Sequence, residues 1–244
     1  MTIRGKKVLV TGGSRGIGYE IARRLVTEGC EVIVTGRNED TLKKAAETIG
    51  AKWMVWDIAD ISILKEKFGE VIKTLGGLDT VVSNAGVLTR EDHEWGMGML
   101  ELTEDEWDNV ININLKANFF LMQTTVKYFY ENGIKGNLLN IGSVASIEPS
   151  CGPYGVSKVG VAGLTKGWGK QFAPFGIVIN SIGPGPIATE MNHWHEGDSL
   201  AHSRIPTGRF GTVEEVGELA MYLLSKEAVQ VIGQTFIIDG AYDI

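Results

Sequence analysis

The sequence predicts an α/β fold, a doubly wound parallel sheet of seven strands with helices on both faces, and three observations support this class. Short apolar runs rich in β-branched residues alternate with longer segments of helical period, as parallel strands joined by crossover helices do. The 244 residues are 43% hydrophobic and 22% charged, which is enough for one large core. The chain contains no repeat, low-complexity tract or linker, so we expect one domain over residues 1–244.

The first half of the chain supplies four predicted strands, which are Lys7–Thr11, Glu31–Thr35, Lys52–Trp56 and Thr80–Ser83. Three helices are predicted between them, at Gly16–Glu28, Glu39–Ile49 and Ile61–Leu75. In the first helix, Ile17, Ile21 and Leu25 recur at the spacing of one helix face, which predicts a side packed on the sheet. Gly76 and Gly77 are expected to end the third helix.

The second half opens with a polar loop, Leu88–Leu102, and continues with two capping boxes that begin at Thr103 and Thr212. The predicted helices run from Thr103 to about Tyr130, from Tyr154 to about Phe172 and from Thr212 to about Ser225. The predicted strands are Asn137–Ile141, Ile177–Ser181 and Thr235–Ile238. Pro184–Gly208 is expected to be a long irregular segment.

Composition excludes several classes of function. The formal net charge is −7, so no broad basic surface for nucleic acid is indicated. No apolar segment approaches the ~20 residues of a membrane span, and the first apolar run is too short for a signal-peptide core. The two cysteines, Cys30 and Cys151, provide no disulfide framework and suit a reducing cytoplasm, where we expect the protein.

A glycine-rich loop joins the first predicted strand to the first predicted helix. Its sequence, Thr11-Gly-Gly-Ser-Arg-Gly-Ile-Gly18, places Gly12, Gly16 and Gly18 where a backbone must turn tightly. The start of a helix offers free N–H groups and a positive dipole end to phosphates. We therefore predict a dinucleotide site here, with Ser14, Arg15 and Ile17 beside the glycines. The alternative interpretation is a glycine-rich turn that binds no ligand.

The tip of the second predicted strand indicates which dinucleotide is bound. In Val34-Thr-Gly-Arg-Asn38 no acid stands where a carboxylate would bind the ribose 2′-hydroxyl and select NAD. Arg37, with Asn38 beside it, is placed for a 2′-phosphate, and Arg15 can reach the same side. We therefore predict NADP(H) over NAD(H). NAD(H) stays the alternative, because Glu39 and Asp40 follow closely and either carboxylate could fold back toward the ribose.

The segment Leu139–Lys158 combines an apolar strand, a loop of small residues and the start of a helix. Tyr154 and Lys158 are four residues apart and so share one helix face. A nearby cation lowers a tyrosine pKa from its usual ~10, so such a tyrosine can exchange a proton near neutral pH. Ser143, at the strand end, can donate a hydrogen bond to a substrate oxygen. The alternative interpretation is an ordinary helix with a surface tyrosine and lysine.

These motifs, taken in order, resemble those of the short-chain dehydrogenases/reductases, in the shorter single-domain group. The matching residues span the chain and are Thr11-Gly12-x-x-x-Gly16-x-Gly18, Asp57, Asn84-Ala85-Gly86, Asn114, Ser143, Tyr154-x-x-x-Lys158, Pro184-Gly185 and Thr189. The resemblance implies a Rossmann fold and an oxidoreductase that acts on CH–OH donors with NAD(P)⁺ as acceptor. It also implies a homotetramer, and the helix Tyr154–Phe172 carries small and apolar residues suited to a symmetric contact.

The resemblance further implies a cofactor-binding role for several of these positions. Asp57 and Ile58 would hold the adenine, and Asn84-Ala85-Gly86 would pack along the ribose. The stretch Pro184–Thr189, which includes Gly185, would fix the nicotinamide carboxamide through the Ile187 backbone and the Thr189 hydroxyl.

The resemblance also implies a catalytic tetrad. Tyr154 would be the proton donor and acceptor, and Ser143 would hold the reacting oxygen. Lys158 would bind the nicotinamide ribose and lower the pKa of Tyr154. Asn114 would hold a water that links Lys158 to solvent.

Two polar loops with embedded aromatic residues, Arg90–Leu100 and Met191–Pro206, are expected to contact the substrate. They suit a hydroxylated or charged molecule, so we predict a small sugar, polyol or ketone. One alternative is a beta-ketoacyl carrier-protein reductase; Lys170 favours it, but Ile134 stands where a second basic residue would help to bind an acidic carrier. Another alternative is a non-enzymatic NAD(P)-sensing protein. The histidines of Met191–Pro206 lack the fixed spacing of a metal site, so we predict no metal.

Overall fold

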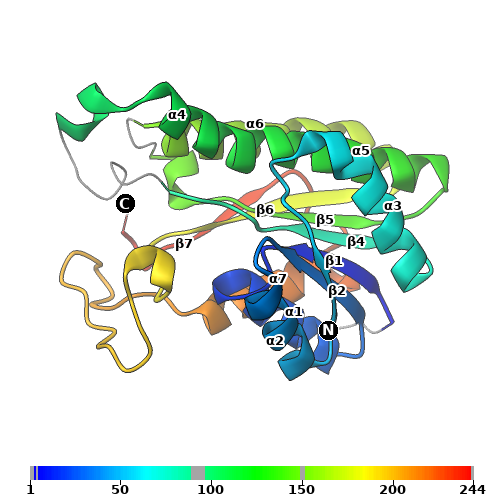
Figure 1. The fold of residues 1–244 in the computed structure, drawn as a ribbon, viewed down its shortest axis with the longest axis horizontal. Coiled ribbons are helices and arrows are strands. Elements are labelled where there is room, and N and C mark those ends of the chain that lie inside the picture. The colour runs from blue at the N-terminus through cyan, green and yellow to red at the C-terminus, as the bar shows by residue number, and fades with distance from the viewer. Residues whose placement is uncertain (1–2, 4, 89–96, 149–151, 243–244) are drawn as a thin grey trace.

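The computed structural model describes residues 3, 5–88, 97–148 and 152–242. In this described part the strands form a seven-stranded parallel sheet in the order β3-β2-β1-β4-β5-β6-β7, with helices on both faces (Figure 1). The strands are β1 Lys7–Thr11, β2 Glu31–Gly36, β3 Lys52–Val55, β4 Thr80–Ser83, β5 Asn137–Ile141, β6 Val178–Pro184 and β7 Thr235–Ile238. The predicted fold class is confirmed.

The helices divide into two layers, one on each face of the sheet (Figure 1). They are α1 Gly16–Thr27, α2 Glu39–Ile49, α3 Leu64–Leu75, α4 Glu104–Val110, α5 Asn118–Glu131, α6 Pro153–Phe172 and α7 Val213–Leu224. Because side chains alternate along a strand, Val8 and Val10 of β1 enter the core beneath α1, α2 and α7, and Leu9 enters the core beneath α3, α5 and α6. The sheet is thereby buried on both faces, as a parallel sheet requires.

Most element bounds agree with the sequence-based expectation, and the differences have local causes. The strand expected at Ile177–Ser181 extends to Pro184, because β6 keeps pairing with β7 up to the pair Pro184–Ile238. The helix expected from Ile61 starts as a 3₁₀ turn, Ile61–Ile63, whose N-terminus is capped by the Asp60 carboxylate. Both predicted capping boxes are present.

The helix expected from Thr103 to about Tyr130 is interrupted. Between α4 and α5 the segment Ile111–Ala117 is π-helical. π-Helical turns inside longer helices are found frequently at functional sites. Asn114 lies in the middle of this segment, so the irregular geometry coincides with a predicted site residue.

An ion-pair network centred on a buried carboxylate of α1 reaches α7 through Arg24. Glu20 is 4% exposed and binds Arg23 at 2.7 Å and Arg24 at 2.6 Å, while Arg24 also reaches Glu218 on α7 at 2.5 Å. Burial disfavours the charged carboxylate, but the hydrogen bonds from the two arginines outweigh it and lower the pKa of Glu20. A Cβ on Gly217 would lie 2.6 Å from Arg24 Nε, so glycine at this position leaves room for the Arg24 side chain.

Candidate active site

A cavity of about 1400 Å³ opens at the carboxyl ends of the strands. That end of an open parallel sheet, beside the point where the strand order reverses between β1 and β4, is the expected ligand site. The predicted site residues that line the cavity are Gly12, Ser14, Arg15, Gly16, Ile17, Arg37, Asp57, Ile58, Asn84, Ala85, Gly86, Ser143, Tyr154, Lys158, Pro184, Gly185, Ile187 and Thr189. Three predicted residues do not line it, namely Gly18, Asn38 and Asn114.

The glycine loop forms one wall of the cavity. The N–H groups of Gly12 and Gly13 donate to Thr35 O at 2.9 and 3.1 Å, which ties the loop to β2. Gly12 and Gly16 have φ values of 66° and 58°, in the left-handed region that favours glycine. Gly18 has a packing role instead, since a Cβ there would overlap the Asn84 side chain.

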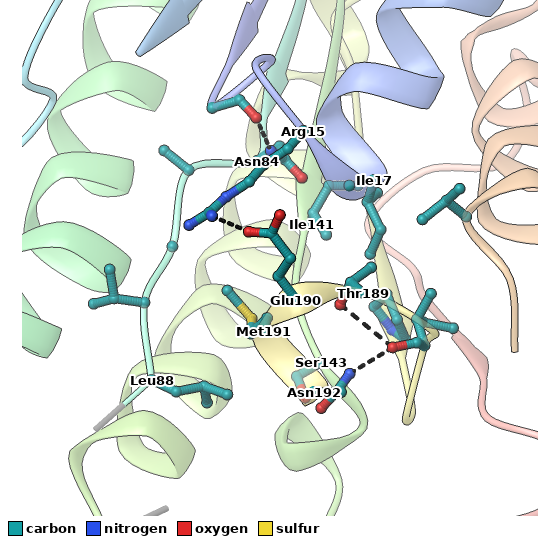
Figure 2. Close-up of a pocket in the computed structure, with 18 of the residues that line it drawn as sticks. Arg15, Ile17, Asn84, Leu88, Ile141, Ser143, Thr189, Glu190, Met191 and Asn192 are labelled. Carbon is teal, nitrogen blue, oxygen red and sulfur yellow. Dashed lines mark hydrogen bonds and ion pairs between the residues drawn. The ribbon is translucent and has the colours of Figure 1, made fainter. Parts of the chain in front are cut away.

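Asn84 connects this loop to the end of β4. Its Nδ2 donates to Thr11 O at 3.0 Å and to Gly12 O at 2.9 Å, and Thr11 Oγ1 accepts from the N–H groups of Asn84 and Ala85. Figure 2 shows Asn84 beside the loop. Both amide protons of Asn84 are therefore used inside the protein, and the side chain positions the two cofactor-side loops against each other.

The cavity wall at the ends of β2 and β3 carries a cation. Arg37 is exposed, lines the cavity and has no ion-pair partner among the described residues. Asn38 instead caps α2, where its Oδ1 accepts from Thr41 N–H at 3.0 Å. Glu39 and Asp40 lie in the first turn of α2, and in the described part of the chain neither lines the cavity. The carboxylates that could have favoured NAD therefore do not border the cavity.

Arg15 reaches across the cavity mouth. Its Nη1 pairs with the Glu190 carboxylate, as Figure 2 shows, and joins the glycine loop to the segment that follows β6. The two side chains are 75% and 58% exposed, so the pair is open to solvent and to salt. Arg15 is thus paired with Glu190 in this structure, and its predicted contact with a cofactor phosphate stays a prediction.

Tyr154 and Lys158 lie one turn apart on α6, as their spacing predicted. The Lys158 Nζ is 5.4 Å from the centre of the Tyr154 ring and donates to Ile141 O at 3.1 Å. Lys158 is only 6% exposed, and burial lowers its pKa from 10.5 to about 8. The ammonium therefore stays mostly charged at neutral pH, close to the tyrosine, although it is easier to deprotonate than a surface lysine.

Ser143 follows the end of β5, and its side chain lines the cavity (Figure 2). Its Oγ accepts from Ala145 N–H at 3.1 Å and so caps the 3₁₀ turn Val144–Ser146. Among the described residues the Ser143 hydroxyl donates to none, so its proton is available to an oxygen in the cavity. The bond to Ala145 also fixes the direction from which that proton is offered.

Asn114 lies behind the cavity wall and holds it in place. Its Oδ1 accepts from Val87 N–H at 2.9 Å, and its Nδ2 donates to Val87 O at 2.9 Å and to Ser157 Oγ at 3.3 Å. Both amide protons are used, so a water bound by Asn114 would have to donate to one of its oxygens. A Cβ on Gly86 would lie 3.3 Å from Asn114 Oδ1 and 3.7 Å from Lys158 Nζ, so glycine lets this wall approach α6.

The segment after β6 forms the opposite wall. Thr189 Oγ1 and Asn192 Nδ2 both donate to Ile187 O, at 3.3 and 2.8 Å, and hold the short 3₁₀ helix Glu190–Asn192 over the cavity (Figure 2). Further along, Trp194, His195, Glu196 and Arg204 line the cavity. His193 and His202 do not line it.

Some residues predicted for the site lie outside the described part of the chain. One residue that lines the cavity, Tyr242, was not predicted. His93 and Trp95 of the other predicted substrate loop, and Cys151, lie outside the described residues. Tyr242 belongs to none of the sequence motifs, yet it lines the cavity. Its hydroxyl accepts a hydrogen bond from Arg204 at 2.9 Å. No sequence signal connects Tyr242 to the site, because only the fold brings it there.

The described residues contain neither a metal-binding cluster nor a membrane-spanning helix. They contain no group of three or more His, Cys, Asp or Glu side chains arranged to hold a metal ion. No helix among them has the length and apolar character needed to cross a membrane.

Comparisons with known proteins agree with this geometry. A family model described as Enoyl-(Acyl carrier protein) reductase matches residues 12–243. The chain is 36% identical to the 3-oxoacyl-[acyl-carrier-protein] reductase of Thermotoga maritima over 98% of each chain. It is 33% identical to the gluconate 5-dehydrogenase of Gluconobacter oxydans, over 100% of this chain and 96% of that one. A short chain dehydrogenase from Burkholderia cenocepacia, solved in complex with NADP, superposes with a TM-score of 0.86 at 28% identity, over 99% of each chain.

Proposed function

Since this chain belongs to the short-chain dehydrogenase/reductase family of oxidoreductases, we propose that it interconverts a carbonyl and a secondary alcohol on a small polar substrate with NADP(H). The observation that carries the proposal is that Ser143, Tyr154 and Lys158 all line one cavity, with Lys158 Nζ 5.4 Å from the centre of the Tyr154 ring. A hydroxyl with an available proton, a tyrosine and a buried cation there face the same space.

The cavity fits a nicotinamide dinucleotide. Gly12 and Gly16 form a cradle in which a side chain at Gly12 would contact the Ala85 backbone at 3.0 Å. The cavity volume exceeds the ~300–1,000 Å³ of ordinary small-molecule pockets, which leaves room for cofactor and substrate together. Arg37 offers an unneutralised guanidinium at the end of β2, and this supports NADP(H) over NAD(H).

The proposed mechanism assigns one task to each of these side chains. When bound, the nicotinamide supplies or accepts the hydride. In reduction the Tyr154 hydroxyl gives its proton to the substrate oxygen, and in oxidation the tyrosinate takes that proton back. Ser143 donates a hydrogen bond to the same oxygen and stabilises the charge that develops there. Lys158 stabilises the tyrosinate, and Asn114 keeps the Val87 backbone against α6.

The test is turnover of a carbonyl and alcohol panel with NADPH and NADP⁺ by the Tyr154→Phe variant. Because a positioned acid or base typically contributes 10²–10⁴-fold, we expect kcat to fall by about 10³-fold while NADPH still binds. Tyr130→Phe is the matched control, since Tyr130 is exposed on α5 and its ring packs against Phe175. A near-normal rate in Tyr154→Phe would show that another group transfers the proton.

Reduction of a beta-ketoacyl group on a carrier protein is the second candidate. It is favoured by the 36% identity to a 3-oxoacyl-[acyl-carrier-protein] reductase. The net charge of −7 opposes an acidic carrier, and Ile134 is half-buried where a basic residue would serve. Comparing acetoacetyl-coenzyme A with hydroxylated ketones in the same assay distinguishes the candidates.

We also propose that the protein is a homotetramer of single-domain chains that works in the cytoplasm. An apolar groove lined by residues of the segment Ile111–Ala117, of α5 and of α6, such as Leu115, Phe119 and Gly160, supports a self-contact. Val156 and Val159 on α6 are 47% and 43% exposed, so this face carries apolar surface. The free thiol of Cys30, which is buried, suits a reducing compartment.

A further inference from the structure

Four arginines line the cavity in the described part of the chain, and two of them are neutralised. Arg15 pairs with Glu190, and Arg23 binds Glu20 at 2.7 Å. Arg37 and Arg204 have no carboxylate partner among the described residues. Arg37 lies at the tip of β2, where the proposed cofactor explains it. The charge of Arg204, on the segment after β6, is not explained by the cofactor.

Arg204 is held by a neutral group. Its Nη2 donates to the Tyr242 hydroxyl at 2.9 Å, and both side chains line the cavity. A phenol orients the guanidinium without cancelling its charge. Of the five N–H donors of Arg204, one is used in this contact, and a guanidinium fork matches a carboxylate with two parallel hydrogen bonds. Glu148 and Glu196 also line the cavity, and neither pairs with Arg204.

A second arginine on the same segment shows the contrast. Arg209 lies five positions further along and binds both carboxylate oxygens of Glu215, at 2.7 and 3.1 Å. Arg209 does not line the cavity. An arginine with a structural role on this segment is therefore neutralised by an acid, whereas the one at the cavity keeps its charge.

We propose that Arg204 binds a carboxylate of the substrate, so that the substrate is a small hydroxylated carboxylic acid of the sugar-acid class. The inference rests on the proposed function, since it needs a reacting CH–OH or carbonyl group at Ser143 and Tyr154. Ser143, Tyr154 and Arg204 line one cavity, so the carboxylate and the reacting carbon of one substrate would be held in the same space. The 33% identity to a gluconate 5-dehydrogenase agrees with this substrate class. A carrier-bound beta-ketoacyl group ends in a thioester and has no carboxylate for Arg204 to bind.

The experiment compares acids and alcohols that share one carbon skeleton. D-Gluconate and D-glucitol have the same hydroxyl configuration and differ only at C1, a carboxylate in one and CH₂OH in the other; D-galactonate and galactitol form a second pair. The kcat/KM of NADP⁺-dependent oxidation is measured for each, together with calorimetric binding to the complex of protein and NADP⁺. We expect the wild type to prefer the acid of a pair by about tenfold or more.

Three variants test whether Arg204 causes the preference for the acid over the alditol. Arg204→Gln should abolish it through KM, with kcat changed by less than about threefold, because in the proposed role the guanidinium binds the carboxylate and takes no part in the transfer of the proton. Tyr242→Phe should reduce it by a smaller factor, since the guanidinium loses its orienting partner. Arg209→Gln is the matched control, because it removes an arginine from the same segment but outside the cavity, and it should leave the preference unchanged.

The possible outcomes distinguish a failure of the carboxylate site from a failure of the proposed oxidoreductase function. Equal kcat/KM for acids and alditols in the wild type, or an equal loss on both in Arg204→Gln, overturns the carboxylate site and leaves the oxidoreductase function standing. Turnover of acetoacetyl-coenzyme A without binding of any acid overturns it in the same way. Absence of turnover with every carbonyl and alcohol overturns the proposed function. The calorimetry then tests the carboxylate site by itself. Acids that bind no more tightly than the matching alditols refute the carboxylate site.

Discussion

We expect one substitution at the tip of β2 to reverse the proposed preference for NADP(H) over NAD(H). Gly36 is the last residue of β2 and stands where a carboxylate would bind the free ribose diol of NAD. A Cβ built on Gly36 would lie 3.4 Å from Leu42 Cδ1 and 3.9 Å from Ser14 Oγ, which are ordinary contacts, and the residue does not have a positive φ. Gly36→Asp should therefore fold without strain and place a carboxylate beside Arg37.

The size of the effect follows from the charges. A carboxylate about 5 Å from a 2′-phosphate in water is repelled by roughly 1.5 kcal/mol, and its hydrogen bonds to a ribose diol are worth about 1.5 kcal/mol. Together these shift the ratio of kcat/KM with NADPH to kcat/KM with NADH by about a hundredfold toward NADH. Arg37→Ala removes one charge-assisted contact from an exposed side chain and should lower the same ratio about tenfold.

The assay measures that ratio in the wild type, Arg37→Ala, Gly36→Asp and Gly36→Ala. We expect a wild-type ratio above about ten, since Arg37 lines the cavity and no described carboxylate opposes it. Gly36→Ala adds the Cβ without the charge and controls for packing, so its ratio should match the wild type. A wild-type ratio below one, or a ratio that Arg37→Ala and Gly36→Asp leave unchanged, would refute this account of the pocket.

Three further predictions follow from other contacts. Burial lowers the pKa of Lys158 from 10.5 to about 8, so the unfolded chain binds more protons than the folded protein between those values, and the Lys158 contribution to stability rises with pH across that window. The wild-type free energy of unfolding in urea, minus that of Lys158→Met, should therefore rise by about 3 kcal/mol between about pH 7 and pH 10.5; a constant difference would contradict the burial argument. Glu190→Gln releases Arg15 for phosphate, and fluorescence titration should show NADPH binding up to about threefold more tightly at low salt, whereas weaker binding would mean that the pair holds the site together. Light scattering should return a multiple of the 26.5 kDa chain mass at micromolar concentration, and a mass of 26.5 kDa would end the tetramer proposal.

The sequence predicted those elements whose signals are local. Strands β1, β4, β5 and β7 and helix α2 have the bounds expected from their apolar runs and caps. The π-helical segment Ile111–Ala117 could not be predicted, because the helical period continues through it. Its geometry accompanies the hydrogen bonds between Asn114 and Val87, two residues 27 positions apart in the chain. Contacts of that kind exist only in the folded protein.

In the candidate site, too, local sequence patterns predicted some features, whereas others depend on contacts made only in the folded protein. Spacing alone placed Tyr154 and Lys158 on one helix face, and the glycine pattern placed the loop at the cavity. Sequence patterns did not show that Asn38 caps a helix or that Arg15 turns to Glu190, because each side chain had more than one partner within reach. Tyr242 was missed altogether. The catalytic and cofactor roles themselves stay predictions until variants test them.

A sequence motif does not distinguish a residue that reacts from one that positions a reacting residue. The hydrogen bonds in the structure help to make this distinction, because they show which donors are already used. Asn84 and Asn114 use both amide protons on backbone carbonyls or a serine hydroxyl, and these bonds join the loops and link Val87 to α6. Ser143 accepts one bond and keeps its proton, and Lys158 uses one of three protons on Ile141 O. Donors that remain at the cavity are those that a substrate or cofactor can engage. Losses at the asparagines should therefore appear in stability as well as in rate. The loss of the Ser143 hydroxyl should appear mainly in rate, with a smaller loss of stability from the missing cap of the Val144–Ser146 turn.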